Sequence, residues 1–314
     1  MNDHAKPAAG TADAAAADRA DIAGLEPLAR TRQRWPVVLI TLISLAMAGG
    51  LVRELLRFGL AGIDKAAPDN PLFYLLFLCV YLNNPVGDYV IFRGLWHIPF
   101  VRGLAALLKK RIANDVVVGY TGDLYFYLWA RQNAPMVAAP FGAVKDVAIL
   151  SAIAGNGLSL VMLAIALWLG GGLMTQDQYG IAAGSFAIIA AVSLPFLIFS
   201  NRVFSLPSDR LWWVFGIHAL RIVTGFIFVA AAWHVALPSV PIGMWIFLAA
   251  ARLLTSRIPL ASNSDLLFAT FAIMLIGEGE ALSQLIAFTA ACTLLLHAAL
   301  TLLFGLQSLS RLKI

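Results

Sequence analysis

The run SQLIAFTAACTLLLHAALTLLFGL, residues 283–306, has 24 residues and contains no Asp, Glu, Lys or Arg. A helix that crosses a bilayer needs roughly 17–25 mainly apolar residues, so this run is long enough for one crossing. Similar apolar runs occur at residues 36–52, 71–92, 146–169, 180–199, 211–233 and 241–256. The pattern predicts a series of membrane-crossing helices.

The composition of the whole chain supports this prediction. Of the 314 residues, 61% are hydrophobic and only 12% are charged, and the mean hydropathy is +0.83. A soluble domain carries about 25% charged residues. In lipid only helices and closed β-barrels satisfy every backbone hydrogen bond, and barrel strands alternate apolar with polar residues, whereas these runs are continuous. We expect an all-α fold, a polytopic helical membrane bundle, in a bacterial inner (cytoplasmic) membrane.

Two segments are interrupted by polar residues and predict broken helices. The first, residues 112–130, holds Asn, Asp and Gly within an otherwise apolar stretch. The second, residues 257–277, opens with arginine, proline and a polar turn, and its apolar part from Leu266 to Ile276 is short. We expect about eight spans, with one or two broken or re-entrant half-helices. If residues 257–277 enter and leave on the same side, the last long run crosses the membrane in the opposite direction.

The placement of charge predicts the orientation. Residues 1–34 are rich in Ala and charge and have no apolar run, so we expect a disordered cytoplasmic tail rather than a signal peptide, followed by a helical transmembrane domain at residues 35–314. The segment from Arg93 to Lys145 holds seven basic residues, whereas the loops after the third and fifth long runs hold none. The positive-inside rule then places both termini in the cytoplasm. The net charge of +5 lies at the ends of apolar runs and does not indicate nucleic-acid binding.

A basic segment follows the second long run. The residues NNPVGD, Asn83 to Asp88, are expected to break the second span, because proline and glycine disfavour a continuing helix. Residues 93–111 alternate basic side chains with Trp and Leu, which is typical of a helix that lies on the membrane surface. An ordinary positive-inside loop is the alternative.

The two broken segments share a pattern. Arg111-Ile-Ala-Asn-Asp and the segment from Arg257-Ile to Asn263-Ser-Asp265 each place an arginine and a short polar turn before an apolar helix. Interrupted half-membrane segments in the two halves of a chain indicate a transport site built from internal repeats. Both helix N-termini would present positive dipole ends to an anionic group such as a lipid phosphate. The alternative is structural, with Asn263 or a neighbouring serine capping the helix that begins near Asp265.

Short stretches of the chain resemble a known family. Gly122-Asp123 in GYTGDLYFYLWAR is similar to a Gly-Glu pair of the integral membrane flippase-like family, which includes the transmembrane region of lysylphosphatidylglycerol synthases. Pro259 in IPLASNSDLLF and the Phe-Gly-Leu end of the last span are similar to the later part of its pattern. Here Ala-Ser-Asn-Ser replaces the Gly-rich turn of the family, and the arginine close behind the Gly-Glu pair is missing. The resemblance implies a lipid-translocating bundle but not its substrate.

These patterns single out polar residues as a candidate site. Asp123 and Arg131 are eight residues apart, so a helix places them on one face, where they either form an ion pair or grip a headgroup. Arg221 lies within a long apolar run and either snorkels to the surface or lines a lipid cavity. The candidate substrate-binding residues are Asn114, Asp115, Tyr120, Gly122, Asp123, Arg131, Arg221, Arg257, Asn263 and Asp265.

The sequence lacks the signatures of other functions. It has no phosphate-binding Gly loop, HExxH motif or nucleophile elbow, and its histidines show no metal-ligand spacing, so we assign no catalytic residue, metal or cofactor. Cys79 and Cys292 lie in separate apolar runs and are expected to be packing residues.

We therefore expect a protein that translocates a lipid or lipid-linked intermediate without ATP, with a membrane phospholipid or glycolipid as its partner. An enzyme that modifies a lipid headgroup is the first alternative, because buried carboxylates can act as bases. The second alternative is an accessory subunit that binds a lipid-synthesis enzyme.

Overall fold

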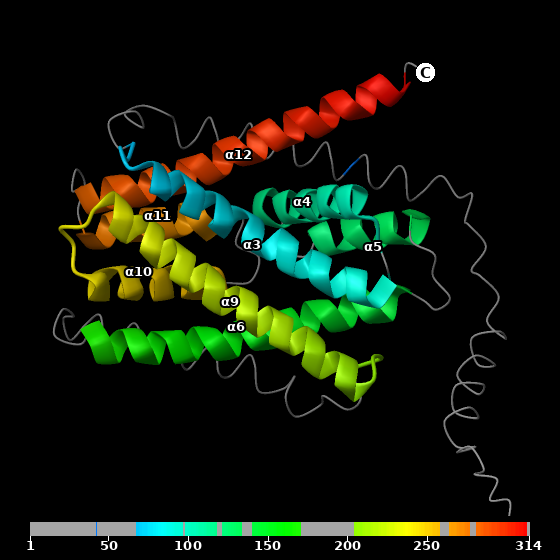
Figure 1. Cartoon of the computed structure of the whole chain (residues 1–314), viewed down its shortest axis with the longest axis horizontal. Coiled ribbons are helices and arrows are strands. Elements are labelled where there is room, and N and C mark those ends of the chain that lie inside the picture. Colours follow the sequence, from blue (N-terminus) through cyan, green and yellow to red (C-terminus); the bar gives the residue numbers. More distant parts are fainter. Residues whose placement is uncertain are drawn as a thin grey trace, which may run out of the picture.

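The computed structural model describes residue 42 and residues 67–96, 98–117, 121–133, 140–170, 204–257, 264–276 and 281–312. In these residues all regular secondary structure is helical, which confirms the all-α fold class. Figure 1 shows the helices α3 (Pro71–Trp96), α4 (Phe100–Val116), α5 (Thr121–Asn133), α6 (Pro140–Gly170), α9 (Ser208–Ala236), α10 (Ile242–Thr255), α11 (Ser264–Ile276) and α12 (Ala281–Leu312).

Within the described residues, four helices are long and apolar enough to cross a membrane. They are Pro71–Trp96, Gly142–Met162 within α6, Ser208–Ala236, and Ala281–Gln307 within α12. Large apolar side chains are exposed on each of them, among them Leu75, Val161, Trp212 and Leu302. Exposed apolar surface of this extent marks contact with a membrane or a partner. Together these features support a multi-pass helical membrane protein.

The described residues hold fewer candidate spans than expected. The expected span at 241–256 is the 14-residue helix α10, and the short span from Leu266 to Ile276 belongs to the 13-residue helix α11. At about 1.5 Å per residue, both are roughly 20 Å long, less than the ~30 Å hydrocarbon core. Four candidate spans remain where six were expected. The other expected spans, at 36–52 and 180–199, and the expected tail at 1–34 lie outside the described residues.

The expected break at NNPVGD is wrong, because α3 continues through Pro85 to Trp96. A proline inside a helix removes the hydrogen bond to the carbonyl four residues earlier, which here belongs to Tyr81. The guanidinium of Arg111 in α4 donates a hydrogen bond to this same Tyr81 oxygen. The carbonyl that Pro85 leaves unpaired is therefore satisfied by a second helix, and α3 tolerates the proline.

Residues 93–111 do not form one continuous helix, and one basic residue of the expected surface helix is buried. Their first part belongs to α3, and α4 begins after Pro99. A helix on the membrane surface keeps its lysines in water. Lys110 is instead only 8% exposed and contacts carboxylates of two neighbouring helices, so one face of α4 is buried in the bundle.

Proline marks the start of most described helices. Both α3 and α6 begin at a proline, and α4, α9 and α10 each begin one residue after a proline. The first N–H groups of a helix have no partner inside it, so a proline there costs no hydrogen bond, and its fixed φ suits the first turn. Only Pro85 lies in the interior of a described helix.

Helices α3 and α9 cross and pack closely (Figure 1). Gly87 of α3 faces Arg221, and a Cβ added to this glycine would lie 2.9 Å from Arg221 Cδ. In return, Gly225 of α9 faces the Asn83 amide, whose oxygen accepts a hydrogen bond of 3.0 Å from the Thr224 hydroxyl. A glycine on each helix thus lets a polar side chain of the other approach its backbone, a common feature of membrane helix pairs.

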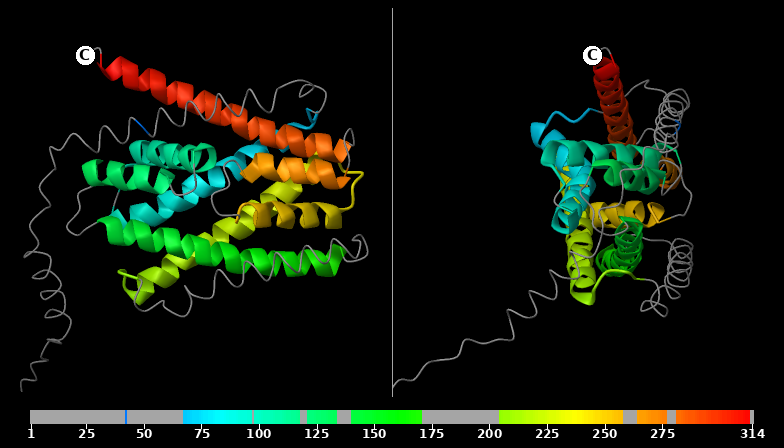
Figure 2. Two further views of the ribbon diagram at one scale, coloured as in Figure 1. Left: turned by 180° about the vertical axis from the view of Figure 1, so that it is seen from behind. Right: turned by 90° about the vertical axis from the view of Figure 1, so that its right-hand side faces the viewer.

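Helices α6, α10, α11 and α12 lie next to one another in that order (Figure 2). Trp233 of α9 joins this layer to the crossing pair. Its ring centroid lies 5.9 Å from that of Trp245 in α10 and 5.9 Å from that of Phe268 in α11. Its indole N–H donates to Thr289 Oγ1 of α12 at 3.0 Å. One buried tryptophan therefore contacts three neighbouring helices.

Helices α4 and α5 lie side by side (Figure 2). The backbone N–H of Gly122, in the first turn of α5, donates to Asn114 Oδ1 at 2.7 Å. A Cβ at Gly122 would overlap the carbonyl oxygen of Lys110 in α4. The two helices approach this closely because residue 122 has no side chain.

We predict that Gly122→Ala destabilises the protein. The added methyl group meets backbone, so α5 has to shift, and overpacking of this kind costs about 1–3 kcal/mol. Thermal unfolding in detergent measures the effect. The control is Gly216→Ala, because an added Cβ there has nothing within 4 Å. Equal unfolding temperatures for the two variants would contradict the close α4–α5 contact.

Candidate functional site

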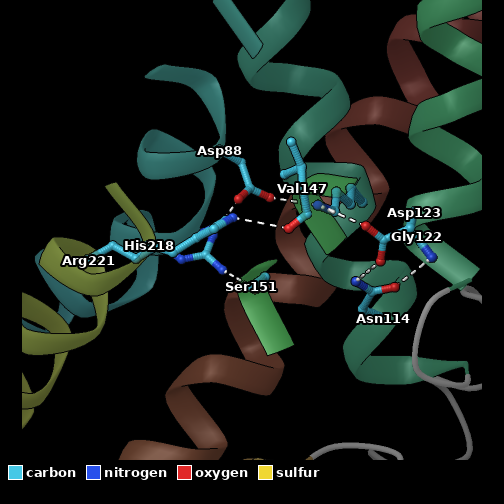
Figure 3. A network of polar contacts seen from close by, with 9 residues as sticks. Asp88, Asn114, Gly122, Asp123, Val147, Ser151, His218 and Arg221 are labelled. Atoms are coloured by element: carbon cyan, nitrogen blue, oxygen red, sulfur yellow. Dashed lines mark hydrogen bonds and ion pairs between the residues drawn. The ribbon is translucent and has the colours of Figure 1, made fainter. Parts of the chain in front are cut away.

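Asp88 is a buried carboxylate of α3 that two cations hold (Figure 3). It is 7% exposed. Lys110 Nζ of α4 lies 2.7 Å from one carboxylate oxygen, and the guanidinium of Arg221 in α9 donates to the other. A buried charge is stable only when it is paired and hydrogen-bonded, so these contacts explain how Asp88 is accommodated in an apolar bundle.

Lys110 extends this network to α5. Its Nζ lies 3.0 Å from Asp123 Oδ1, and Asn114 Nδ2 donates to Asp123 Oδ2 at 3.2 Å. The Asn114 amide oxygen in turn accepts the hydrogen bond from Gly122 N. Figure 3 shows these side chains turned toward one another, so the Asp123 carboxylate is engaged by α4.

Arg221 extends the network to α6. Its Nη2 donates to Ser151 Oγ at 2.7 Å. One turn earlier in α9, Nε2 of the buried His218 lies 3.1 Å from the carbonyl oxygen of Val147 in α6. The network, defined by Asp88, Lys110, Asp123, Arg221 and Ser151, therefore joins α3, α4, α5, α6 and α9 (Figure 3).

A cavity of about 130 Å³ lies beside this network and shares Arg221 with it. A water molecule needs about 10–15 Å³, so the space suffices for several waters or one small polar group. Six charged side chains line the cavity: Arg111, Asp115, Arg221, Arg252, Arg257 and Asp265. Neutral polar residues also line it, namely Asn83, Asn84, Ser256 and Ser264, and the rest of the lining is apolar side chains and Gly225.

Two of the cavity arginines contact carboxylates that also line the cavity. Arg252 Nη2 of α10 lies 2.8 Å from Asp265 Oδ1 of α11. Arg111 Nε lies 3.4 Å from Asp115 Oδ2, one turn along α4. Asp265 is in the first turn of α11, where the helix dipole also favours a negative charge. Each pair leaves further guanidinium N–H donors, because a guanidinium has five.

The positions of Arg111 and Arg257 depend on a second helix. Arg111 lies over the Tyr81 ring, with 4.2 Å between its Cζ and the ring centroid, and donates to the Tyr81 carbonyl. Arg257 follows the end of α10, and its guanidinium lies against Gly155 of α6, where a Cβ would overlap it. The missing side chain at Gly155 lets this cation approach the α6 backbone.

The structure brings parts of the two predicted broken segments together. Asp115 of the first and Asp265 of the second line the same cavity, together with Arg221 and Arg257. The expected polar turn of the first segment is wrong, because residues 111–116 are helical and form the end of α4. Of these two segments, only the second therefore begins a helix at the cavity.

The other candidate residues lie away from the cavity lining. Asn114, Gly122 and Asp123 contact one another in the neighbouring network. Asp123 is held by Lys110 and Asn114, and Arg131 lies in the last turn of α5, outside the cavity lining. Two candidates lie outside the described residues: Tyr120 and Asn263.

Four charged residues of the network and the cavity are absent from the sequence-based candidates: Asp88, Lys110, Arg111 and Arg252. Asp88 and Arg252 each lie in a long apolar run, and an ionisable residue in such a run is itself a signal of an internal site. Lys110 belongs to a basic segment that the positive-inside rule already explains, so its sequence context gives no such signal.

The cavity suits an anionic ligand with several oxygen atoms. Guanidinium groups present planar N–H donors that match the geometry of phosphate and carboxylate oxygens. Among the residues that the structure describes, no group of three His, Cys, Asp or Glu is placed to hold a metal ion.

Comparison with known proteins gives no match of the chain to a family model, a curated protein or a solved structure. The resemblance to the integral membrane flippase-like family stays a prediction, and the function has to be argued from the site.

We predict that Asp88→Asn lowers the stability of the folded bundle. The amide keeps the side-chain volume but leaves Arg221 without its carboxylate partner and Lys110 with only that of Asp123, and breaking a buried pair costs about 3–5 kcal/mol. Denaturation in detergent, followed by tryptophan fluorescence, measures the effect. The control is Asp209→Asn, an exposed aspartate in the first turn of α9. If both variants unfold like the wild type, the bundle does not depend on the Asp88 network.

Proposed function

We propose that this protein translocates a lipid or lipid-linked intermediate across a bacterial inner membrane, with both termini in the cytoplasm and without ATP. The phosphate of the headgroup binds in the arginine-lined cavity. One observation carries the proposal: four arginines, from α4, α9 and the end of α10, line a cavity in a bundle with four long apolar helices.

The charges of the lining favour an anion. Arg111 and Arg252 each contact one carboxylate, and a guanidinium can donate to further acceptors. Arg221 contacts Asp88 and Ser151, but within the described residues its buried Nε has no hydrogen-bond partner. A phosphate offers several strong acceptors to such donors, and charge-assisted hydrogen bonds of this kind are about twice as strong as neutral ones.

The surroundings of the cavity favour a lipid as the carrier of that anion. The long helices expose leucine, valine and tryptophan side chains, as expected where hydrocarbon surrounds the bundle. The cavity has room for a headgroup phosphate but not for acyl chains, because its volume is about 130 Å³. The headgroup therefore enters the bundle while the chains stay in the bilayer.

Two short helices favour translocation over permanent binding. α10 and α11 have 14 and 13 residues, and α11 begins at the cavity with Ser264 and Asp265. Transport proteins commonly build their sites at the ends of such discontinuous helices. A phosphate that enters the cavity competes with Asp265 for the Arg252 guanidinium, and the Arg252–Asp265 ion pair re-forms when the phosphate leaves.

We predict that Arg252→Gln slows lipid exchange between leaflets in reconstituted vesicles by at least about tenfold, because a hydrogen bond to a charged group contributes about 1.5–3 kcal/mol. The measurement uses phosphatidylglycerol labelled on an acyl chain and a reagent that quenches only the outer leaflet. The control is Arg93→Gln, since Arg93 is exposed and donates to Tyr89 Oη at 2.8 Å, away from the cavity.

The double variant Arg252→Gln/Asp265→Asn separates function from folding. It replaces the ion pair by two amides, so no buried charge is left alone, and it should exchange lipid as slowly as the single variant. If vesicles with the folded wild type exchange lipid between leaflets no faster than vesicles without protein, the translocase proposal is wrong. A chemically altered headgroup would then favour the lipid-modifying enzyme, and co-purification of a lipid-synthesis enzyme would favour the accessory subunit.

A further inference from the structure

His297 of α12 is a buried histidine with unused ring nitrogens. It is fully buried, and within the described residues neither nitrogen has a hydrogen-bond partner. Its ring packs against that of Tyr81 at a centroid distance of 5.4 Å. A buried polar group without a partner costs about 1–3 kcal/mol, so a histidine kept in this place is poorly explained by packing alone.

A carboxylate that lines the cavity, that of Asp115, lies close to His297. His297 Nε2 lies 3.5 Å from Asp115 Oδ2, which is longer than a normal hydrogen bond but short enough for a small side-chain rotation to form one. The same Asp115 oxygen is the one that Arg111 approaches at 3.4 Å. Asp115 therefore stands between a permanent cation and a side chain that becomes a cation when it takes a proton.

The groups around this pair fix how its charge can change. Besides the pair itself, the charged or titratable side chains that face it or its cavity are Tyr81 of α3, Arg111 of α4, Arg221 of α9, Arg252 of α10, Arg257 just after α10, and Asp265 of α11. The arginines keep their charge at every relevant pH. When a phosphate draws Arg111 toward the cavity, Asp115 loses its cation, and a proton on His297 or on Asp115 itself replaces it.

We propose that Asp115 and His297 form a proton-binding site, and that an anionic headgroup binds in the cavity together with one proton. The proton comes from water and ends on His297 Nε2 or Asp115 Oδ2, shared in one hydrogen bond. One negative charge and one positive charge enter together, so the net charge of the buried cluster does not change. The inference rests on the proposed function, since it takes the cavity as the site of the transported anion.

The coupling has a consequence for energetics. Taking a charge into a low-dielectric bundle is expensive unless it is compensated. A proton taken up with the anion provides this compensation. By linkage, the anion then promotes proton binding as much as the proton promotes anion binding.

The test is equilibrium binding to the full chain in a neutral detergent between about pH 5 and pH 8, the range in which an imidazole titrates. The probes are dihexanoyl phosphatidylglycerol, inorganic phosphate, and uncharged dihexanoylglycerol as the blank. For wild type, affinity for the phospholipid should rise as the pH falls, by up to about tenfold per pH unit for one coupled proton. Calorimetry in two buffers of different ionisation enthalpy should show the proton uptake directly.

Matched variants locate the proton. Asp115→Asn and His297→Gln should bind the phospholipid with an affinity that no longer depends on pH. His218→Gln should keep the wild-type dependence, because this equally buried histidine is engaged with the Val147 carbonyl and does not line the cavity. The calorimetric uptake is measured on wild type, so it decides the question even if a variant fails to fold.

Each outcome has one meaning. A flat pH dependence in wild type, a full dependence in His297→Gln, or no binding of either anionic probe overturns the proton site. Equal binding of inorganic phosphate and phospholipid supports the site and assigns it to oxyanions in general, whereas binding of the phospholipid alone supports it and assigns it to the headgroup. Proton-linked binding without leaflet exchange overturns the proposed translocation and leaves the proton site standing.

Discussion

The charge of Asp88 is the constraint on which the arrangement of the helices depends. A carboxylate inside a candidate span has to be neutralised, and its two cations, Lys110 and Arg221, come from helices far apart in the sequence. Lys110 also contacts Asp123, and Arg221 also contacts Ser151, so neutralising one charge fixes five helices relative to one another. Apolar contact alone selects poorly among arrangements in lipid, because the lipid tails are as apolar as the helices.

Pro85 creates a second link between α3 and α4, because it leaves one backbone carbonyl of α3 without a hydrogen bond inside the helix. The proline leaves the Tyr81 carbonyl without its helical hydrogen bond. The Arg111 guanidinium donates a hydrogen bond to this carbonyl and lies over the Tyr81 ring. The same guanidinium lines the cavity and approaches Asp115. A local loss of one backbone hydrogen bond thus positions a cation of the candidate site, which is why the break expected at this proline is absent.

Composition and run length predict the fold class and the long helices α3, α9 and α12, because a helix that crosses lipid has to be long and nearly uncharged. They place α10 and α11 to within two residues, but α10 is shorter than the span expected at 241–256, and neither helix is long enough to be a candidate span. Four cavity residues follow from the rarity of charge in apolar or broken segments: Asp115, Arg221, Arg257 and Asp265. Lys110 does not follow, because it lies between Lys109 and Arg111, and only the packing of α4 shows that it turns toward Asp88 and Asp123.

Arg221 belongs both to the Asp88 network and to the cavity, so a ligand in the cavity can affect the contact between α3 and α9. Its guanidinium donates to Asp88 and Ser151, and the residue lines the cavity. An anion that draws this guanidinium away weakens the neutralisation of Asp88, and Lys110, already shared with Asp123, cannot fully replace it. A charge in the cavity therefore changes the free energy of the contacts that hold α3 against α9. Differential binding to two helix arrangements is what a ligand needs in order to shift the balance between them.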